Sequence, residues 1–147
     1  GVIPITDPEM TRFNVSLEEE ADIVLLALSN AWGGELFIPK LASFRITDLA
    51  KAICPECKLE VIGLRPAEKI HEDLITEADS VNTVEFDKYF VILPSIPVWD
   101  AEKWKNTFKG KMVAPGFRYN SAKNERWLSV EDLRTQIMKY VDPEFAT

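Results

Sequence analysis

The chain has 147 residues, the size of one domain with a moderate hydrophobic core. Its 46% hydrophobic and 28% charged residues are ordinary for a globular protein and argue against disorder. A formal net charge of −7 without an evident basic face argues against nucleic-acid binding. No apolar run approaches the roughly 20 residues that cross a bilayer, and no signal-peptide pattern opens the chain, so we expect a cytoplasmic protein without a membrane span.

The amino-terminal part predicts an extended segment followed by a helix. Residues 1–13 are expected to be extended, with a turn at Asp7. Ser16 and Glu19 have the spacing of a capping box, so a helix should begin there and end before Gly33. The apolar residues of this helix recur at helical spacing: Leu17, Ala21, Val24, Leu25 and Leu28.

The middle of the chain alternates short strands with helices. Strands are predicted at residues 35–39 and 58–62, and a helix at about residues 46–54. Proline suits the first turn of a helix, so a further helix should follow Pro66. Its inward residues would be Ile70, Leu74 and Ile75.

The carboxyl-terminal part predicts a hairpin and two helices. Residues 83–86 and 89–93 can pair as two strands. A helix is expected over residues 100–108, and a last one is capped by Ser129 with Asp132 three residues on. Strands that alternate with helices predict an α/β architecture.

A candidate anion site follows the strand at residues 58–62. Arg65 would lie between the end of that strand and the start of the predicted helix, where a guanidinium and backbone N–H groups can bind a diphosphate. Glu68 is placed to accept a hydrogen bond from a hydroxyl such as that of a ribose. With Arg12 as a second cation, these residues predict a nucleotide-sugar site.

The cysteines predict no metal site. Cys54 and Cys57 are the only pair, and with His71 as the sole histidine the ligand set for zinc is incomplete. A redox CxxC motif would begin a helix, whereas this one follows a predicted helix. We therefore interpret the two residues as structural thiols at a turn.

Signatures of cofactor binding and catalysis are missing from the sequence. No GxGxxG motif follows a strand, and no GxxxxGK[ST] loop is present. The one Tyr-x-x-x-Lys pair, Tyr119 with Lys123, falls in a predicted polar loop. We therefore expect the chain to be part of a larger enzyme.

Several segments match one family in its own order along nearly the whole chain. They are residues 5–13, 33–40, 48–50, 65–72, 89–94 and 119–121, with Asn124, Trp127 and Leu128. In combination they resemble the carboxyl-terminal half of the inverting UDP-N-acetylglucosamine 4,6-dehydratases. These are extended short-chain dehydrogenase/reductase enzymes of bacterial polysaccharide biosynthesis.

The resemblance implies an α/β fold, the carboxyl-terminal portion of an extended Rossmann-like enzyme. Residues 1–147 would form one unit, with residues 1–62 at the edge of the Rossmann-like sheet and residues 63–147 in a substrate-binding lobe with the last helix. The complete protein would be a lyase that uses NADP to convert a UDP-sugar into a 4-keto-6-deoxy sugar. An amino-terminal half would supply NADP binding and catalysis, so this chain alone would hold no cofactor and be inactive.

The resemblance also assigns roles to residues. Arg12 and Arg65 match arginines near the phosphates, Glu68 matches a carboxylate at the ribose, and Met10 and Thr11 would line the nucleotide site. His71 and Glu72 are expected to orient the loop that carries Arg65. The family usually has glycine where Ala67 stands; because Pro66 sets a helical φ, we expect Ala67 in a first helical turn, where alanine is harmless.

The partners implied are UDP-N-acetylglucosamine or a related UDP-sugar, a missing amino-terminal Rossmann half, and further copies of the chain. An apolar stripe on the helix after Ser16 would be exposed without that half, and it predicts homo-oligomers. Two alternatives stay open. The chain could be a non-catalytic split subunit or oligomerisation module, or it could come from a retaining dehydratase or a UDP-sugar 4-epimerase.

Overall fold

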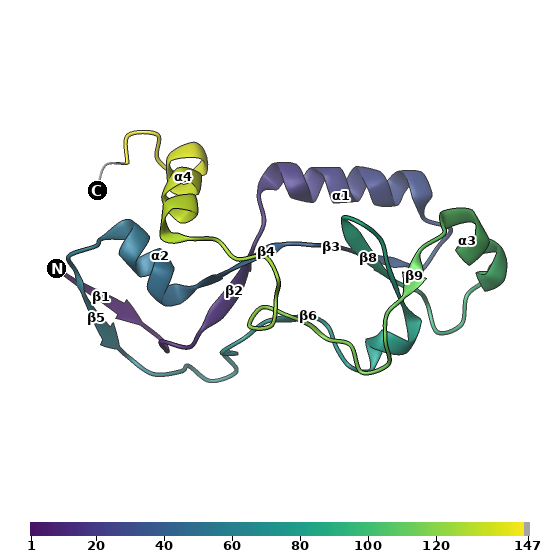
Figure 1. Cartoon of the computed structure of the whole chain (residues 1–147), viewed down its shortest axis with the longest axis horizontal. Helices are drawn as coiled ribbons and strands as arrows, with labels where there is room; N and C mark the ends of the chain where they lie inside the picture. The colour runs from purple at the N-terminus through teal and green to yellow at the C-terminus, as the bar shows by residue number, and fades with distance from the viewer. Residues whose placement is uncertain (146–147) are drawn as a thin grey trace. The chain divides into compact units, whose positions relative to one another are not determined.

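The computed structural model describes residues 1–145, which form two compact units (Figure 1). Unit 1 combines Gly1–Asn14, Ala42–Glu72 and the chain from Asn120 onward. Unit 2 combines Val15–Leu41 with Asp73–Tyr119. The chain therefore passes from one unit to the other several times. The expected roles of residues 1–62 and 63–147 stay a prediction.

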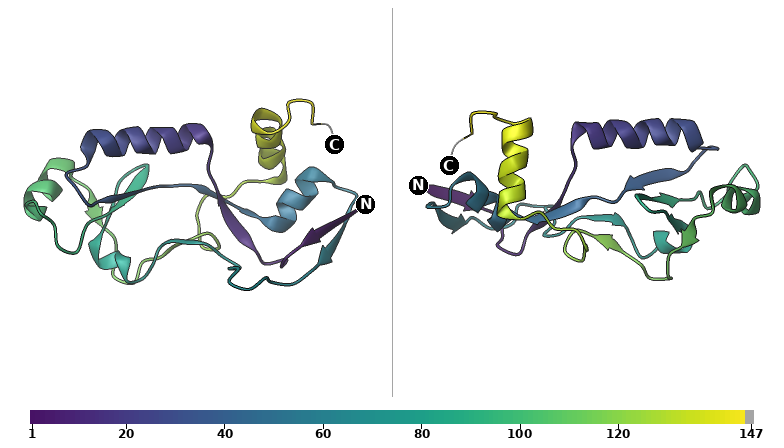
Figure 2. Two further views of the ribbon diagram at one scale, coloured as in Figure 1. Left: turned by 180° about the vertical axis from the view of Figure 1, so that it is seen from behind. Right: turned by 45° about the horizontal axis from the view of Figure 1, so that its top comes forward.

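Unit 1 contains two small sheets and two helices (Figures 1 and 2). Strands β1 and β5 are parallel, with Ile3 opposite Leu59, whereas β2 and β4 are antiparallel, with Arg12 opposite Phe44. Helices α2 and α4 pack against each other. The elements are β1 (Val2–Ile5), β2 (Thr11–Asn14), β4 (Ala42–Arg45), α2 (Ile46–Ile53), β5 (Lys58–Val61) and α4 (Val130–Tyr140).

Unit 2 is built around a four-stranded antiparallel sheet in the order β3-β8-β7-β9. Its core consists of Val84, Val91, Leu93 and Trp104, with aromatic side chains packed around them. A short pair, β6 with β10, completes the strands, and the sequence boundary between the two units falls within β10. The elements are α1 (Leu17–Asn30), β3 (Leu36–Pro39), β6 (Asp73–Ile75), η1 (Asp79–Asn82), β7 (Thr83–Glu85), β8 (Tyr89–Ile92), α3 (Ala101–Phe108), β9 (Lys111–Met112) and β10 (Tyr119–Asn120).

The predicted helix starts are confirmed at the atomic level. Oγ of Ser16 accepts from the N–H of Glu19, and the Glu19 carboxylate accepts from the N–H of Ser16, which is a complete capping box. Ser129 and Asp132 form the same box at α4. These bonds satisfy N–H groups that a helix cannot pair internally. The hairpin of β7 with β8 is also confirmed.

Helix α1 carries apolar residues on two faces. None of its residues is fully buried, and the half-buried ones are Ile23, Leu26, Ala27 and Asn30. The stripe that the sequence picks out lies on the other side: Leu17 is 81% exposed, Leu25 62% and Leu28 77%. Within residues 1–145 this second apolar face is therefore uncovered.

The helix predicted after Pro66 is wrong. Arg65 to Glu68 form a β-turn instead, because the N–H of Glu68 donates to the carbonyl of Arg65 at 3.1 Å. Ala67 has a φ of 65°. Proline at the second position and a positive φ at the third are the marks of a type II turn. The expectation of a helical Ala67 is thus also wrong, and Leu74 and Ile75 lie in strand β6.

None of the helices within residues 1–145 has both the length and the hydropathy needed to cross a membrane.

Candidate functional site

Arg12 binds the segment at residues 69–72 from strand β2. Its Nη1 donates to the carbonyl oxygens of Thr11 at 2.7 Å and Ile70 at 3.0 Å. Its Nη2 donates to the carbonyl of Lys69 at 2.8 Å, and its Nε lies 3.4 Å from a carboxylate oxygen of Glu72. A guanidinium has five N–H groups, and three of them are used on carbonyls here. Two of these bonds and the contact with Glu72 tie Arg12 to the segment at residues 69–72.

A buried polar network fixes the same segment at His71 and Glu72. Thr11 is 4% exposed and Ser121 is 0% exposed, and their hydroxyl oxygens lie 2.6 Å apart. Oγ1 of Thr11 also lies 2.8 Å from Nδ1 of His71. Ser121 pairs with Glu72 twice, since its Oγ accepts from the Glu72 N–H and its own N–H donates to the Glu72 carbonyl. Buried polar groups are costly unless paired, so this network favours a single loop position.

The type II turn presents Arg65 to solvent. Within the part of the chain that the structure describes, the Arg65 side chain is exposed and its guanidinium has no hydrogen bond or ion pair with another residue. Glu68 closes the turn, because its carboxylate accepts from the N–H of Arg65 at 3.0 Å and from the hydroxyl of Thr6 at 3.4 Å. Arg65 thus has a cationic group available for an anion, but it does not sit beside a helix N-terminus as the sequence predicts.

The remaining predicted site residues lie inside unit 1. Met10 is 3% exposed, and its carbonyl accepts from the N–H of Ile46 at the start of α2. Thr11 belongs to the buried network. The structure therefore brings Arg12 to the loop that carries Arg65 and Glu68, and it buries Met10 and Thr11 within unit 1. Their ligand roles stay predictions.

Ser121 is the residue that the sequence reasoning missed. It appears there only as part of a matching segment, without a role. Its partners Thr11 and Glu72 lie 110 and 49 residues away, a separation that no local pattern indicates. Only a signal that links distant positions of the sequence could have identified Ser121.

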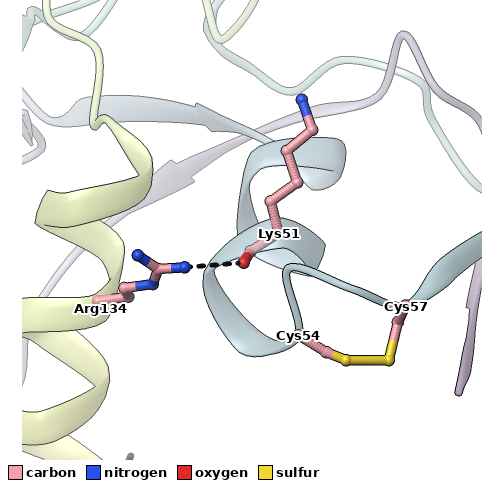
Figure 3. The surroundings of a disulfide bond; sticks show 4 residues. All are labelled: Lys51, Cys54, Cys57 and Arg134. Carbon is pink, nitrogen blue, oxygen red and sulfur yellow. Dashed lines mark hydrogen bonds between the residues drawn. A yellow bond between two sulfur atoms is a disulfide. The ribbon is translucent and has the colours of Figure 1, made fainter. Parts of the chain in front are cut away.

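Cys54 and Cys57 are joined in a disulfide, so they are not the thiols that the sequence predicts (Figure 3). Residues 1–145 contain no cluster of three or more His, Cys, Asp or Glu side chains suited to a metal ion. The clear pKa shifts occur away from the loop. Hydrogen bonds from Thr76 lower the pKa of Asp79, and burial raises the pKa of Tyr89.

Comparison with known proteins identifies the family. Residues 1–94 match the family described as polysaccharide biosynthesis protein, and the chain belongs to that family. It is 44% identical over 138 residues to the inverting UDP-N-acetylglucosamine 4,6-dehydratase of Campylobacter jejuni serotype O:2, covering 89% of this chain and 40% of that protein. It is 31% identical over 149 residues to a UDP-glucose 4-epimerase of Rickettsia felis, covering 97% of this chain and 43% of that protein.

A solved structure shares the fold. The X-ray structure of Pen from Bacillus thuringiensis matches 99% of this chain and 41% of its own with a TM-score of 0.74 and 28% identity. The predicted resemblance to the inverting dehydratases and the predicted α/β class are confirmed. The chain spans only 40% of the dehydratase and 43% of the epimerase.

Proposed function

We propose that this chain is the UDP-sugar-binding, carboxyl-terminal portion of an inverting UDP-N-acetylglucosamine 4,6-dehydratase. The observation that carries the proposal is the 44% identity to the Campylobacter jejuni dehydratase over 89% of the chain. Identity to the Rickettsia felis epimerase is 31%. The complete protein would form a 4-keto-6-deoxy sugar nucleotide for polysaccharide biosynthesis in the cytoplasm.

Arg65 is the proposed pyrophosphate ligand. Its exposed guanidinium can offer two parallel N–H groups to phosphate oxygens, and charged hydrogen bonds of this kind contribute roughly 1.5–3 kcal/mol each. Glu68 would accept from a ribose hydroxyl with lone pairs not used on Arg65 and Thr6. Arg12 would add its remaining N–H capacity near the phosphates, while Met10 and Thr11 support the site from the core.

The part of this chain in the reaction is to bind and orient the UDP moiety. NADP, held by the rest of the complete enzyme, would supply the hydride transfer from C4 to C6 of the sugar. Arg12, Arg65 and Glu68 are proposed to bind UDP and have no role in proton transfer. The isolated chain should therefore bind UDP without turnover.

Calorimetric titration tests the binding. UDP and UDP-N-acetylglucosamine should bind the isolated chain weakly, and Arg65→Ala should weaken UDP binding by about tenfold or more. Lys123→Ala is a matched control, because it removes an exposed positive charge of unit 1 outside the loop. Equal affinities for all three proteins, or no heat from a folded chain, would count against the assignment.

Product analysis separates the dehydratase from the epimerase. The chain combined with an NADP-carrying Rossmann half should convert UDP-N-acetylglucosamine into a 4-keto-6-deoxy sugar with an inverted C5, which NMR can identify. Formation of the 4-epimer with the 6-hydroxyl retained would favour the epimerase alternative.

A second candidate is a non-catalytic interaction module. The uncovered apolar face of α1, formed by Leu17, Val24, Leu25 and Leu28, favours it because exposed apolar stripes mark interaction surfaces. In this alternative the chain would associate with itself or with a separate Rossmann half, and it would not bind UDP measurably.

A further inference from the structure

We propose that the Cys54–Cys57 disulfide is a redox-sensitive restraint on strand β5 and on the loop that follows it. The bond connects the carboxyl end of α2 to the residue immediately before β5. Cys54 caps α2, with its N–H bonded to the carbonyl of Ala50, and the N–H of Cys57 donates to the carbonyl of Cys54. The proposal is independent of the ligand that the loop binds.

The helix end of this restraint is well anchored. Ala50 and Ala52 of α2 are 1% and 0% exposed. Nε of Arg134, in α4, donates to the carbonyl of Ala52 at 3.3 Å. Its Nη2 donates to the carbonyl of Lys51 at 3.4 Å, as Figure 3 shows. The disulfide therefore begins at a helix terminus that a second helix already fixes.

The strand end is held much less firmly. All four residues of β5 are exposed, and within the described chain its sheet contains only β1 as a partner. Two-stranded sheets are marginally stable alone, and parallel pairing is slightly weaker than antiparallel pairing. The N–H of Lys58 donates to the carbonyl of Gly1, and that of Ile62 to the carbonyl of Ile5. A covalent link to α2 limits how far β5 can separate from β1.

The restraint acts on the loop because β5 leads directly into it. Gly63 lies two residues after the end of the strand at Val61, and Arg65 lies eight residues after Cys57. The far end of the loop is fixed by Arg12 and by Ser121. Reduction would therefore release the near end of the loop while its far end stays bound.

A dithiol can reduce the Cys54–Cys57 disulfide in two exchange steps. A thiolate of the dithiol attacks one sulfur and forms a mixed disulfide, and the protein's other cysteine leaves as a thiolate. The second thiol of the reagent then displaces the first cysteine, so the reagent becomes a cyclic disulfide and the protein gains two electrons and two protons.

Hydrogen exchange with mass spectrometry tests the proposal on the chain itself. Reduction with dithiothreitol should raise exchange of the β5 amides and of the Ile62 and Glu68 N–H groups on the order of tenfold. The hairpin amide of Phe86, in unit 2, should not change. The double variant Cys54→Ser, Cys57→Ser should show the raised exchange with and without dithiothreitol.

Three results would overturn the proposal. The first is that amide exchange in β5 does not change, although alkylation shows that both cysteines have been reduced. The second is an equal rise at Phe86, since the bond would then hold the whole fold. The third is full alkylation of both cysteines in unfolded, unreduced protein, because no disulfide would then exist.

Discussion

Nη1 of Arg12 lies 3.0 Å from the carbonyl oxygen of Ile70, although the two residues are 58 positions apart. In a helix, the carbonyls of Lys69 and Ile70 would accept from N–H groups four residues later. The Arg12 guanidinium donates to both carbonyls, and the N–H of Thr11 also donates to the carbonyl of Ile70 at 3.0 Å. These bonds tie the segment to strand β2 without a helix.

The first prediction distinguishes Arg12 from Arg65 by the effect of each on the free energy of unfolding. Arg12→Ala removes three hydrogen bonds to backbone carbonyls and should lower the free energy of unfolding by about 1–3 kcal/mol. Arg12→Lys should recover only part of this, because an ammonium cannot reproduce the planar fork. Urea denaturation followed by circular dichroism gives the values.

Arg65→Ala is the matched control for that series. Arg65 is exposed and its side chain contributes no bond within residues 1–145, so its loss should change the free energy of unfolding by less than about 0.5 kcal/mol. Equal destabilisation by Arg12→Ala and Arg65→Ala would contradict the structural role of Arg12.

The second prediction concerns the positive φ of Ala67. A residue with a Cβ is strained in the left-handed region, and glycine is not, so Ala67→Gly should raise the free energy of unfolding by roughly 0.5–1 kcal/mol. Ala67→Val should lower it, because a β-branched side chain suits this conformation even less. The same urea experiments measure both variants.

Lys109 offers an internal comparison. It ends α3 with a φ of 53°, in the position where helices prefer glycine. Lys109→Gly should therefore also stabilise the protein. If Lys109→Gly raises the free energy of unfolding but Ala67→Gly lowers it, the turn at Arg65 to Glu68 is not of type II.

The sequence predicts local structure where the signal is local. The pairs Ser16 with Glu19 and Ser129 with Asp132 determine helix starts through bonds three residues apart, and both predictions are confirmed. Pro66 misleads for the same reason. Proline suits a first helical turn and also the second position of a type II turn, and alanine at position 67 lacks the glycine signal that a positive φ at the third position would give.

The loop and the site depend instead on distant partners. Arg12 pairs the carbonyls of the loop and Ser121 pairs Glu72, so the conformation is set by tertiary bonds that composition and periodicity do not contain. The patterns of zinc and redox-helix sites do not include a disulfide across a turn, so the interpretation of Cys54 and Cys57 as thiols is wrong. The family resemblance could suggest Arg12 and Arg65 as site residues, but it could not show which of them is bound within the fold.

The third prediction concerns the pH dependence of the capping box that begins α4. The backbone N–H and then the hydroxyl of Ser129 donate to the Asp132 carboxylate, and both lower its pKa below the ordinary 3.8. A lowered folded pKa means that the bonds stabilise the fold fully above the unfolded pKa and that the stabilisation is lost as the pH falls through the folded pKa. An NMR titration of the Asp132 carboxyl should thus have its midpoint below 3.8.

Variants of Ser129 provide the comparison. Ser129→Ala removes the hydroxyl but keeps the backbone N–H, so the pKa of Asp132 should move part of the way back toward its ordinary value. Ser129→Thr retains a hydroxyl and should preserve the lowered pKa. A midpoint that is the same in all three proteins would show that the capping box does not control the ionisation of Asp132.

The last prediction addresses the uncovered face of α1. Leu25 and Leu28 are 62% and 77% exposed, and together with Leu17 they present an apolar stripe to solvent. Burial of apolar area contributes about 25 cal/mol per Å², so pairing of two such stripes is favourable and the isolated chain should self-associate. The double variant Leu25→Glu, Leu28→Glu should shift light-scattering masses toward the 16.7 kDa monomer. Lys123→Glu makes the same change in net charge at an exposed position of unit 1, whereas α1 belongs to unit 2, and it should leave the oligomer intact. Dissociation by both variants would show a general effect of charge. A monomeric unmodified chain would remove the basis for the interface.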